Sequence, residues 1–370
     1  MIPGRGQCAV DDRDLVDPTA AHRCQGQQRA AAGTPVPAHL LSVAAEVAHR
    51  FTVTVPWQAG DVLVVDNSRY LHGRQAFTDT DHYGSHRTTF GGESSNGCAL
   101  GGTMEEAILH GIFEVAERDA FLSTWYARLP VPRVDPMSSA DPMTRLLVRW
   151  LERTTGSRLH VFDITMPEGI PSLWLMLVDE EDRSHSKAFC GAGAHLDPER
   201  ALWAGLVELA SVADATKEVV AGDTTAPDMV ADPDLVVQME DHMLVAAAQQ
   251  SWHRFDFLYQ GDEILSMEQA FPAAERYRPA EDLLDDLTRV VDRYLGEGLD
   301  VVVVDQTAVE QATVDLTAVR VIVPGLVPMV FGHRNRRVDL PQLRDLPVRL
   351  GYRDTPLGPQ EVNPYPHPFP

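Results

Sequence analysis

Residues 94–121, SSNGCALGGTMEEAILHGIFEVAERDAF, decide the expected fold, because a glycine-rich loop here runs directly into a long helical pattern. Thr103 is a good N-cap residue, and Glu106 three positions later completes the pattern of a capping box. Apolar side chains between Ile108 and Ala116 recur at helical spacing and must face a core. The stretch therefore predicts a strongly capped helix with one buried face.

Three glutamates and an arginine lie on or beside one edge of this helix. At about 100° per residue, the eleven steps from Glu106 to Glu117 return to nearly the same direction. Carboxylates that border an apolar face are costly to bury unless a cation or water meets them. Hard oxygen ligands suit Mg²⁺, which commonly binds together with phosphate. From spacing alone, a solvated acidic face on a surface helix remains the alternative.

The residue pattern of this stretch resembles the second signature of the YcaO family. The pattern is SSNG-x3-GGT-x-EEA-x5-FEVAERDAF. YcaO proteins are ATP-dependent enzymes that phosphorylate the oxygen of a backbone amide. Many are cyclodehydratases that form thiazoline and oxazoline rings in ribosomal peptides. The resemblance implies ATP and Mg²⁺ as cofactors, with Glu106 and Glu117 holding Mg²⁺ in a shared polar cleft. It assigns cofactor binding to these residues: Asn96, Glu106, Glu114, Glu117 and Arg118.

Residues 188–217, AFCGAGAHLDPERALWAGLVELASVADATK, resemble the family's third signature of a strand, a GxH-x-DP turn and a helix. Pro198 at the first helical position supports the predicted helix start, because its missing N–H costs nothing there. Glu208 matches the family's glutamate and joins the expected cofactor-binding set. Ala204 and Ser211 stand where the family has an arginine and a glutamine, and neither can replace a guanidinium on a phosphate.

The last residues, NPYPHPFP, have proline at every second position and predict an extended segment. Composition alone also fits a disordered tail or a ligand for a proline-binding module. The resemblance implies another role, because cyclodehydratases of this family end in a Pro-x-Pro-x-Pro tail that reaches the active site. The expected catalytic segment consists of Pro366, His367, Pro368, Phe369 and Pro370.

The amino-terminal part predicts a different organisation. The family's first signature is a GKG loop followed by an S-x3-E-x2-ER helix, and no such sequence is found before residue 94. WQAGDVLVVDNSRYLHGR, within residues 50–76, resembles the C-terminal part of TauD/clavaminate synthase-like oxygenases, with His72 as the distal iron histidine. One histidine cannot complete a facial triad. We expect four segments: a disordered stretch 1–34, an oxygenase-like β fragment 35–83, a partial YcaO-like domain 84–370 and, at its end, a Pro-rich tail 363–370.

Composition limits the function classes. Lys and Arg number 31 against 54 Asp and Glu, a formal charge of −23, which makes nucleic acid and anionic membranes poor partners. No apolar run approaches a membrane span. Four cysteines without a C-x-x-C pair predict neither a disulfide framework nor a structural zinc site, so a reducing cytoplasm is expected.

Between the signatures, helical and extended patterns alternate, and the expected class is α/β (α+β). SRLHVFDI and SLWLMLVD predict paired strands, and LDVVVVDQ predicts a buried strand. Residues 280–298 and 242–252 predict helices, and 221–236 predicts an exposed loop.

The expected function is ATP-dependent activation of backbone amides, which forms azoline rings from Cys, Ser or Thr in a ribosomal precursor peptide. The expected partners are that peptide, an E1-like leader-binding protein and a second copy of the chain. One alternative is an ATP-incompetent relic or scaffold that binds the peptide or the partner protein. A remote alternative is an Fe(II)/2-oxoglutarate oxygenase. We also expect weak ATP binding by the isolated chain, with a second polypeptide that carries the GKG loop completing the site.

Overall fold

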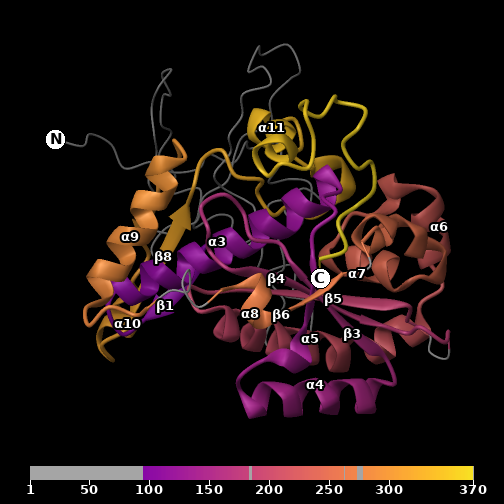
Figure 1. Cartoon of the computed structure of the whole chain (residues 1–370), viewed down its shortest axis with the longest axis horizontal. Coiled ribbons are helices and arrows are strands. Elements are labelled where there is room, and N and C mark those ends of the chain that lie inside the picture. The colour runs from indigo at the N-terminus through magenta and orange to yellow at the C-terminus, as the bar shows by residue number, and fades with distance from the viewer. Residues whose placement is uncertain (1–94, 183–185, 262, 273–277, 370) are drawn as a thin grey trace, which may run out of the picture. The chain divides into compact units, whose positions relative to one another are not determined.

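Helix α3 (Met104–Ala127) packs on two separate sheets in the computed structural model (Figure 1), which describes residues 95–182, 186–261, 263–272 and 278–369. The predicted N-cap is confirmed, since the Thr103 hydroxyl accepts the Glu106 N–H at 3.2 Å. The Glu106 carboxylate accepts the N–H of Gly102 at 2.7 Å instead of that of Thr103. A capping box requires the N-cap residue to donate this bond, and here the residue before the N-cap donates it.

The amino-terminal half of α3 covers a small antiparallel sheet of order β1-β8-β7. Its strands are β1 (Cys98–Gly101), β8 (Thr317–Ile322) and β7 (Val302–Asp305). Helix α9 (Leu283–Gly296) shares the same apolar core. A Cβ at Gly111 would lie 2.6 Å from the Val321 side chain and 2.9 Å from the Gly97 carbonyl. Glycine at 111 therefore permits the close approach of α3 to this sheet.

Strand β7 is an exposed edge strand, so the prediction of a buried strand is wrong. Val302 and Val303 keep 43% and 38% of their surface accessible. Among the described residues, only β8 pairs with β7, and Asp300 before the strand and Asp305 at its end are exposed. Charged residues beside an edge strand discourage pairing with other chains.

The larger sheet has the order β5-β4-β3-β2-β6 and provides the rest of the core. Its strands are β2 (Arg133–Asp135), β3 (Arg158–Asp163), β4 (Ser172–Val178), β5 (Ala188–Ala194) and β6 (Ile264–Ser266). The predicted pairing of β3 with β4 is confirmed, with Phe162 opposite Trp174. Every residue of β4 is buried, because both faces of this sheet are covered.

Helices α4 (Pro142–Thr155) and α5 (Pro198–Gly222) cover one face of the larger sheet, below the sheet in Figure 1. The carboxyl-terminal half of α3 and the end of the chain cover the other face. Side chains of β4 alternate between these layers, Leu173, Leu175 and Leu177 toward α5 and Trp174 and Met176 toward α3.

Helix α5 begins as the sequence predicts, with Asp197 as N-cap and Pro198 in its first turn. The helix lies very close to β5, because glycines face each other across the contact. A Cβ at Gly193 would lie 2.2 Å from the carbonyl oxygen of Ala201 and 2.6 Å from the nitrogen of Gly205. Only glycine fits between these backbones.

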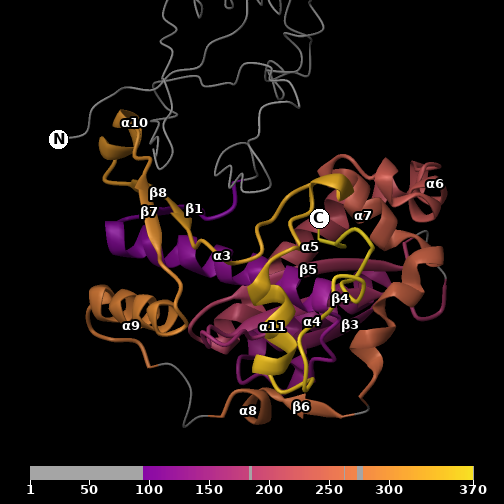
Figure 2. The ribbon, with the colours of Figure 1, turned by 90° about the horizontal axis from the view of Figure 1, so that it is seen from above.

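The remaining elements connect and border these layers, with α6 and α7 at one end of the larger sheet in Figure 2. They are η1 (Pro136–Ser138), α6 (Ala226–Ala231), η2 (Pro233–Leu235), α7 (Met239–Ala247), η3 (Gln249–Tyr259), α8 (Met267–Ala270), α10 (Val309–Ala312), η4 (His333–Asn335) and α11 (Pro341–Arg349). The prediction of a loop at 221–236 is wrong, because α6 and η2 occupy most of this range. Helical structure at 242–252 and 280–298 is confirmed.

The mixture of helices and sheets confirms the expected class. None of the helices in the described ranges has the length and apolar composition of a membrane span. The predictions for residues 1–34 and 35–83, including the β fragment around His72, lie outside the described residues.

Gly193→Ala should destabilise the chain by about 2–3 kcal/mol, because the added methyl group meets backbone atoms that cannot rotate away. Thermal unfolding followed by circular dichroism measures this change. Gly222→Ala is the matched control, since no atom lies within 4 Å of a Cβ at Gly222. Equal unfolding midpoints for the two variants would contradict the proposed close contact.

Candidate functional site

Two glutamates occupy the edge of strand β5 that pairs with no other strand in the described part of the chain, here called its free edge. The Glu117 carboxylate, from α3, accepts a hydrogen bond from the N–H of Ala194. The Glu208 carboxylate, from α5, accepts the N–H of Ala192 at 3.3 Å. Alternate N–H groups of a strand point to the same edge, so one strand fixes the positions of both carboxylates. The short distance from α5 to Gly193 allows Glu208 to reach this edge.

Arg118 lies between these carboxylates. Its Nε is 3.5 Å from Glu117 Oε1, and its Nη2 is 3.5 Å from Glu208 Oε1. Glu114, one turn earlier on α3, accepts the N–H of Gly97 in the loop before β1. One guanidinium therefore faces three carboxylates, and we call Glu114, Glu117, Arg118 and Glu208 the acidic cluster.

The acidic cluster holds more negative charge than Arg118 neutralises. Burial raises the pKa of Glu117 to about 8, and the neighbouring charges of Glu208 and Glu114 add to the increase against the opposing effect of Arg118. Burial also raises the pKa of Glu114, while Arg118 and the Gly97 N–H oppose the shift. A raised carboxyl pKa means that the surroundings disfavour the ionised form, and a bound cation would reverse this preference.

The donor atoms of this region fit a hard divalent cation. Asn96 precedes β1, and its side-chain oxygen is buried without a hydrogen-bond partner in the described part of the chain. An amide oxygen and carboxylates are suitable ligands for Mg²⁺. Over the described residues, no three His, Cys, Asp or Glu side chains already converge as a complete set of metal ligands.

Glu106 lies away from the acidic cluster, although the helical period places it on the same edge of α3. Eleven residues separate it from Glu117, about 16 Å along the helix axis. Its carboxylate accepts the Gly102 N–H at the helix start. A single ion cannot bridge Glu106 and Glu117 at ligand distances of about 2.1 Å.

The proline-rich tail reaches the acidic cluster. The Phe369 ring lies 3.9 Å from the Arg118 guanidinium carbon and is 1% exposed. The same ring meets Phe121 edge-on at 4.7 Å. Figure 1 shows the end of the chain descending from α11 toward β5 and α7. Pro370 lies outside the described residues.

Backbone and side-chain hydrogen bonds hold the tail in place. Trp125 Nε1 donates to the carbonyl of Tyr365, and the Asn363 amide donates to the carbonyl of Trp125. His242 Nδ1 donates to the His367 carbonyl at 2.8 Å. Pro366, His367 and Pro368 are all buried. The tail is thus a packed part of the core and not a free terminus.

His367 contributes to this anchoring. Its Nε2 donates to the carbonyl of Val330 at 3.0 Å, and its ring stacks on His242 at 4.0 Å between centroids. His242 Nε2 in turn accepts the N–H of Gly332, which fixes the hydrogen of His242 on Nδ1. Among the tail side chains expected to be catalytic, the structure brings Phe369 into contact with the cluster and uses His367 as an anchor.

Sequence reasoning missed two residues beside the cluster. Arg320 pairs in register with Cys98 on β1, and its charge lowers the pKa of Glu114 against the larger effect of burial. A single arginine inside the apolar run VRVIV was the available signal. His195 follows Ala194 at the end of β5, and the GxH turn of the third signature was its signal.

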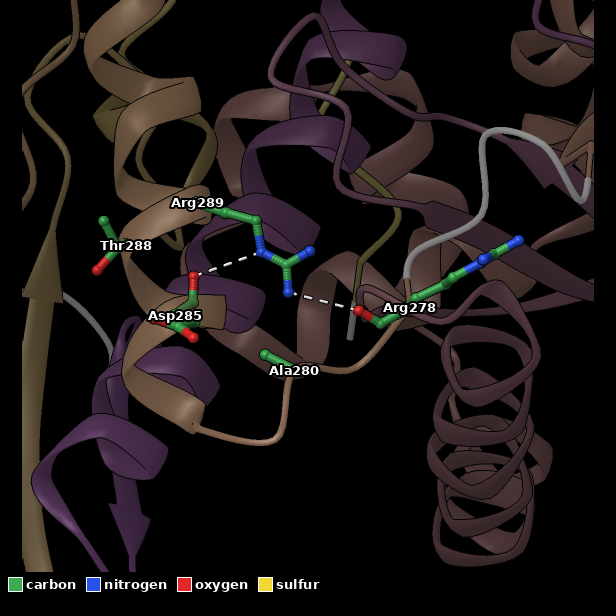
Figure 3. Close-up of a pocket in the computed structure, with 5 residues that line it drawn as sticks. All are labelled: Arg278, Ala280, Asp285, Thr288 and Arg289. Atoms are coloured by element: carbon green, nitrogen blue, oxygen red, sulfur yellow. Dashed lines mark hydrogen bonds between the residues drawn. The ribbon is translucent and has the colours of Figure 1, made fainter.

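A hollow of about 480 Å³ lies elsewhere, at the start of α9 (Figure 3). Its lining consists of Arg278, Ala280, Asp285, Thr288 and Arg289. Arg289 donates to the backbone carbonyls of Asp285 and Arg278. None of the acidic cluster lines this hollow, so its residues carry no part of the chemistry considered above.

Comparison with known proteins identifies relatives of the chain. The family model described as YcaO cyclodehydratase, ATP- and Mg²⁺-binding, matches residues 26–327. An uncharacterised protein encoded in the tfuA 3′ region of Rhizobium leguminosarum bv. trifolii is 28% identical over 288 residues, which are 75% of this chain and 62% of that protein.

Two solved structures of heterocyclases are similar to the chain. The structure of the heterocyclase TruD is 30% identical, with a TM-score of 0.54, and the match covers 75% of this chain and 34% of that one. A heterocyclase in complex with substrate and cofactor is 30% identical, with a TM-score of 0.56, over 75% and 33% of the respective chains. The chain thus spans about a third of the length of these heterocyclases.

The family match extends upstream of the second signature. It begins at residue 26, before the stretch SVAAEVAHR. Ser42, Glu46 and Arg50 keep the spacing of S-x3-E-x2-ER, and His49 stands in place of the second glutamate. This stretch lies outside the residues that the structure describes. The oxygenase resemblance of residues 35–83 stays a prediction.

The raised pKa of Glu117 predicts a pH dependence of stability. Between its ordinary value of 4.5 and about 8, the folded chain keeps a proton that the unfolded chain has lost. Glu117 thus contributes most to stability at low pH, and this contribution falls as pH rises through that range. In Glu117→Gln the new side chain cannot ionise, so the free energy of unfolding should fall less as pH rises through this range.

Urea unfolding from about pH 5 to about pH 9 without divalent ions measures this difference. Burial also raises the pKa of Glu168 to about 8. Glu168 is present in both proteins, so its contribution cancels when their unfolding free energies are compared. Glu105→Gln, on the first turn of the same helix, is the control and should follow the unmodified chain. Parallel curves for Glu117→Gln and the unmodified chain would show that Glu117 ionises normally.

Proposed function

Because the chain belongs to the YcaO family, we propose that it activates peptide backbone amides with ATP and forms azoline rings from Cys, Ser or Thr in a ribosomal precursor peptide. The observation that carries the proposal is the contact of the tail residue Phe369 with Arg118, which in turn lies between Glu117 and Glu208. The 30% identity to heterocyclases supports the cyclodehydratase branch.

In this proposal the acidic cluster binds the metal and the phosphates. Glu117, Glu114 and the buried side-chain oxygen of Asn96 would hold one Mg²⁺, and Arg118 would contact phosphate. Glu106, about 16 Å away along the helix, would hold a separate ion. Bound ATP supplies the phosphoryl group that converts the amide oxygen into a leaving group.

The chain's own residues position and enclose this chemistry. The N–H groups of Ala192 and Ala194 fix the orientation of Glu208 and Glu117 before any ligand binds. Phe369 covers one face of the Arg118 guanidinium and keeps water from it, which strengthens its attraction for phosphate oxygens. Pro366, His367, Pro368 and Pro370 would direct the chain end toward the reacting amide.

One observation favours the alternative of a non-catalytic scaffold. Ala204 and Ser211 lie on the exposed face of α5, where the family's third signature has an arginine and a glutamine. The Ser211 hydroxyl donates to the carbonyl of Val207 in its own helix. Each missing charged contact to phosphate weakens binding by about 1.5–3 kcal/mol. Weak ATP binding is therefore part of the proposal.

The expected partners also remain proposals, because the chain spans only part of its relatives. They are the precursor peptide, an E1-like leader-binding protein and a second copy of the chain. A second polypeptide with an intact first signature would compensate for His49 in this one.

Ala204→Arg should strengthen Mg·ATP binding about tenfold or more. Position 204 is one helical turn before Glu208 on the same face of α5, so the new guanidinium can reach the phosphates. Calorimetric titration of the purified chain with Mg·ATP measures the change. Gln250→Arg adds the same charge at an exposed position of η3 and should leave binding unchanged.

The enzyme and scaffold alternatives differ in turnover. If the chain is an enzyme, the Ala204→Arg variant should release phosphate from ATP, and a Cys- or Ser-containing precursor peptide should stimulate this release. Adding Glu117→Gln to the Ala204→Arg variant should abolish the release. Absence of Mg·ATP binding by every variant, with the peptide still bound, would favour the scaffold.

A further inference from the structure

The side chain of His195 has a fixed pattern of hydrogens. The N–H of Asp197 donates to His195 Nδ1 at 2.9 Å. A backbone N–H can only donate, so Nδ1 carries no hydrogen and the neutral imidazole must carry it on Nε2. Within the described part of the chain, no group accepts a hydrogen bond from this Nε2. His195 therefore presents a free N–H donor of known position.

This donor lies beside the acidic cluster. The His195 ring packs on Phe113 of α3, with 4.9 Å between ring centroids. Phe113 is one turn before Glu117, and Glu117 bonds the N–H of Ala194, the residue next to His195. Two consecutive turns of α3 thus contact two consecutive residues at the end of β5. The ring is half-buried, and Nε2 is not enclosed by protein.

We propose that His195 donates its Nε2 hydrogen to a phosphate oxygen of the nucleotide, as an uncharged ligand-binding residue of this site. The inference rests on the proposed function, because it takes the nucleotide to lie along the edge of α3 next to Glu117. Phosphate oxygens are the acceptors that a free N–H beside a metal-binding carboxylate would meet.

An uncharged donor suits this position. An imidazolium at this position would be repelled by the nearby charge of Arg200. Protonation of Nδ1 would bring its hydrogen against the N–H of Asp197. Burial and the charge of Arg200 lower the pKa of His195 to about 4, so the ring stays neutral above that pH. Asp197 and His110 are the other titratable groups that face it.

The competing explanation is that His195 only shapes the turn before α5 through its bond to Asp197. Two substitutions separate these roles. His195→Asn keeps an acceptor for the Asp197 N–H, as in an Asx turn, and removes the distal donor. His195→Gln places an amide N–H near the position of Nε2 and lacks the ring acceptor.

Calorimetric titration with Mg·ATP tests the proposal. His195→Asn should weaken binding about tenfold or more and keep the thermal midpoint, whereas His195→Gln should retain binding within about threefold. The contribution of His195 should not change between about pH 6 and about pH 8, because the ring does not ionise there. Unchanged binding by His195→Asn, or an equal loss in both variants, overturns the proposal.

Nuclear magnetic resonance of the unmodified chain with ¹⁵N-labelled histidine supplies a measurement that needs no variant. The Nε2–H signal of His195 should shift when Mg·ATP is added, with Nδ1 still unprotonated. Binding without such a shift overturns this inference alone. No binding of Mg·ATP by the unmodified chain at any concentration overturns the proposed function and this inference with it.

Discussion

The excess of carboxylate over guanidinium at the free edge of β5 is the constraint on which the rest of the structure depends. Three glutamates face Arg118, and the charge of Arg320 acts in addition on Glu114. Burial disfavours the ionised forms of Glu114 and Glu117. A chain selected only for stability would gain by replacing one of them with an apolar residue. The unfavourable arrangement makes sense if a cation occupies the site during function.

Close backbone contacts make this arrangement achievable. Gly111 brings α3 against the small sheet, and Gly193 brings α5 against the larger one. Because α3 spans both sheets, it carries Glu114 to the loop before β1 and Glu117 to the edge of β5. The tail then packs against the exposed side of Arg118 through Phe369. The core and the site are therefore built from the same contacts.

Local features of the fold could be predicted from sequence, because short-range interactions determine them. The Thr103 cap, the start of α5 at Pro198 and the pairing of β3 with β4 each depend on neighbouring residues. The exposure of β7 depends on strand order, which the run of valines does not encode. The docking of the tail depends on carbonyls and rings more than a hundred residues away, so its composition could not show it.

For the site, angular periodicity placed Glu106 and Glu117 on the same edge of α3. The rise of the helix, which also follows from the sequence, separates them by about 16 Å and keeps them from sharing one ion. Glu208 was found through its motif, whereas the donor role of His195 depends on a hydrogen bond that only coordinates show.

The central claim is that the acidic cluster binds a divalent cation together with a nucleotide. A crystal structure with Mn²⁺ and a non-hydrolysable ATP analogue tests it most directly, because Mn²⁺ gives an anomalous signal. The account predicts an anomalous peak about 2.1 Å from the Glu117 carboxylate, with phosphate oxygens beside Arg118. Absence of a peak at the Glu117 carboxylate, or an acidic cluster unchanged beside a nucleotide bound elsewhere, would contradict it.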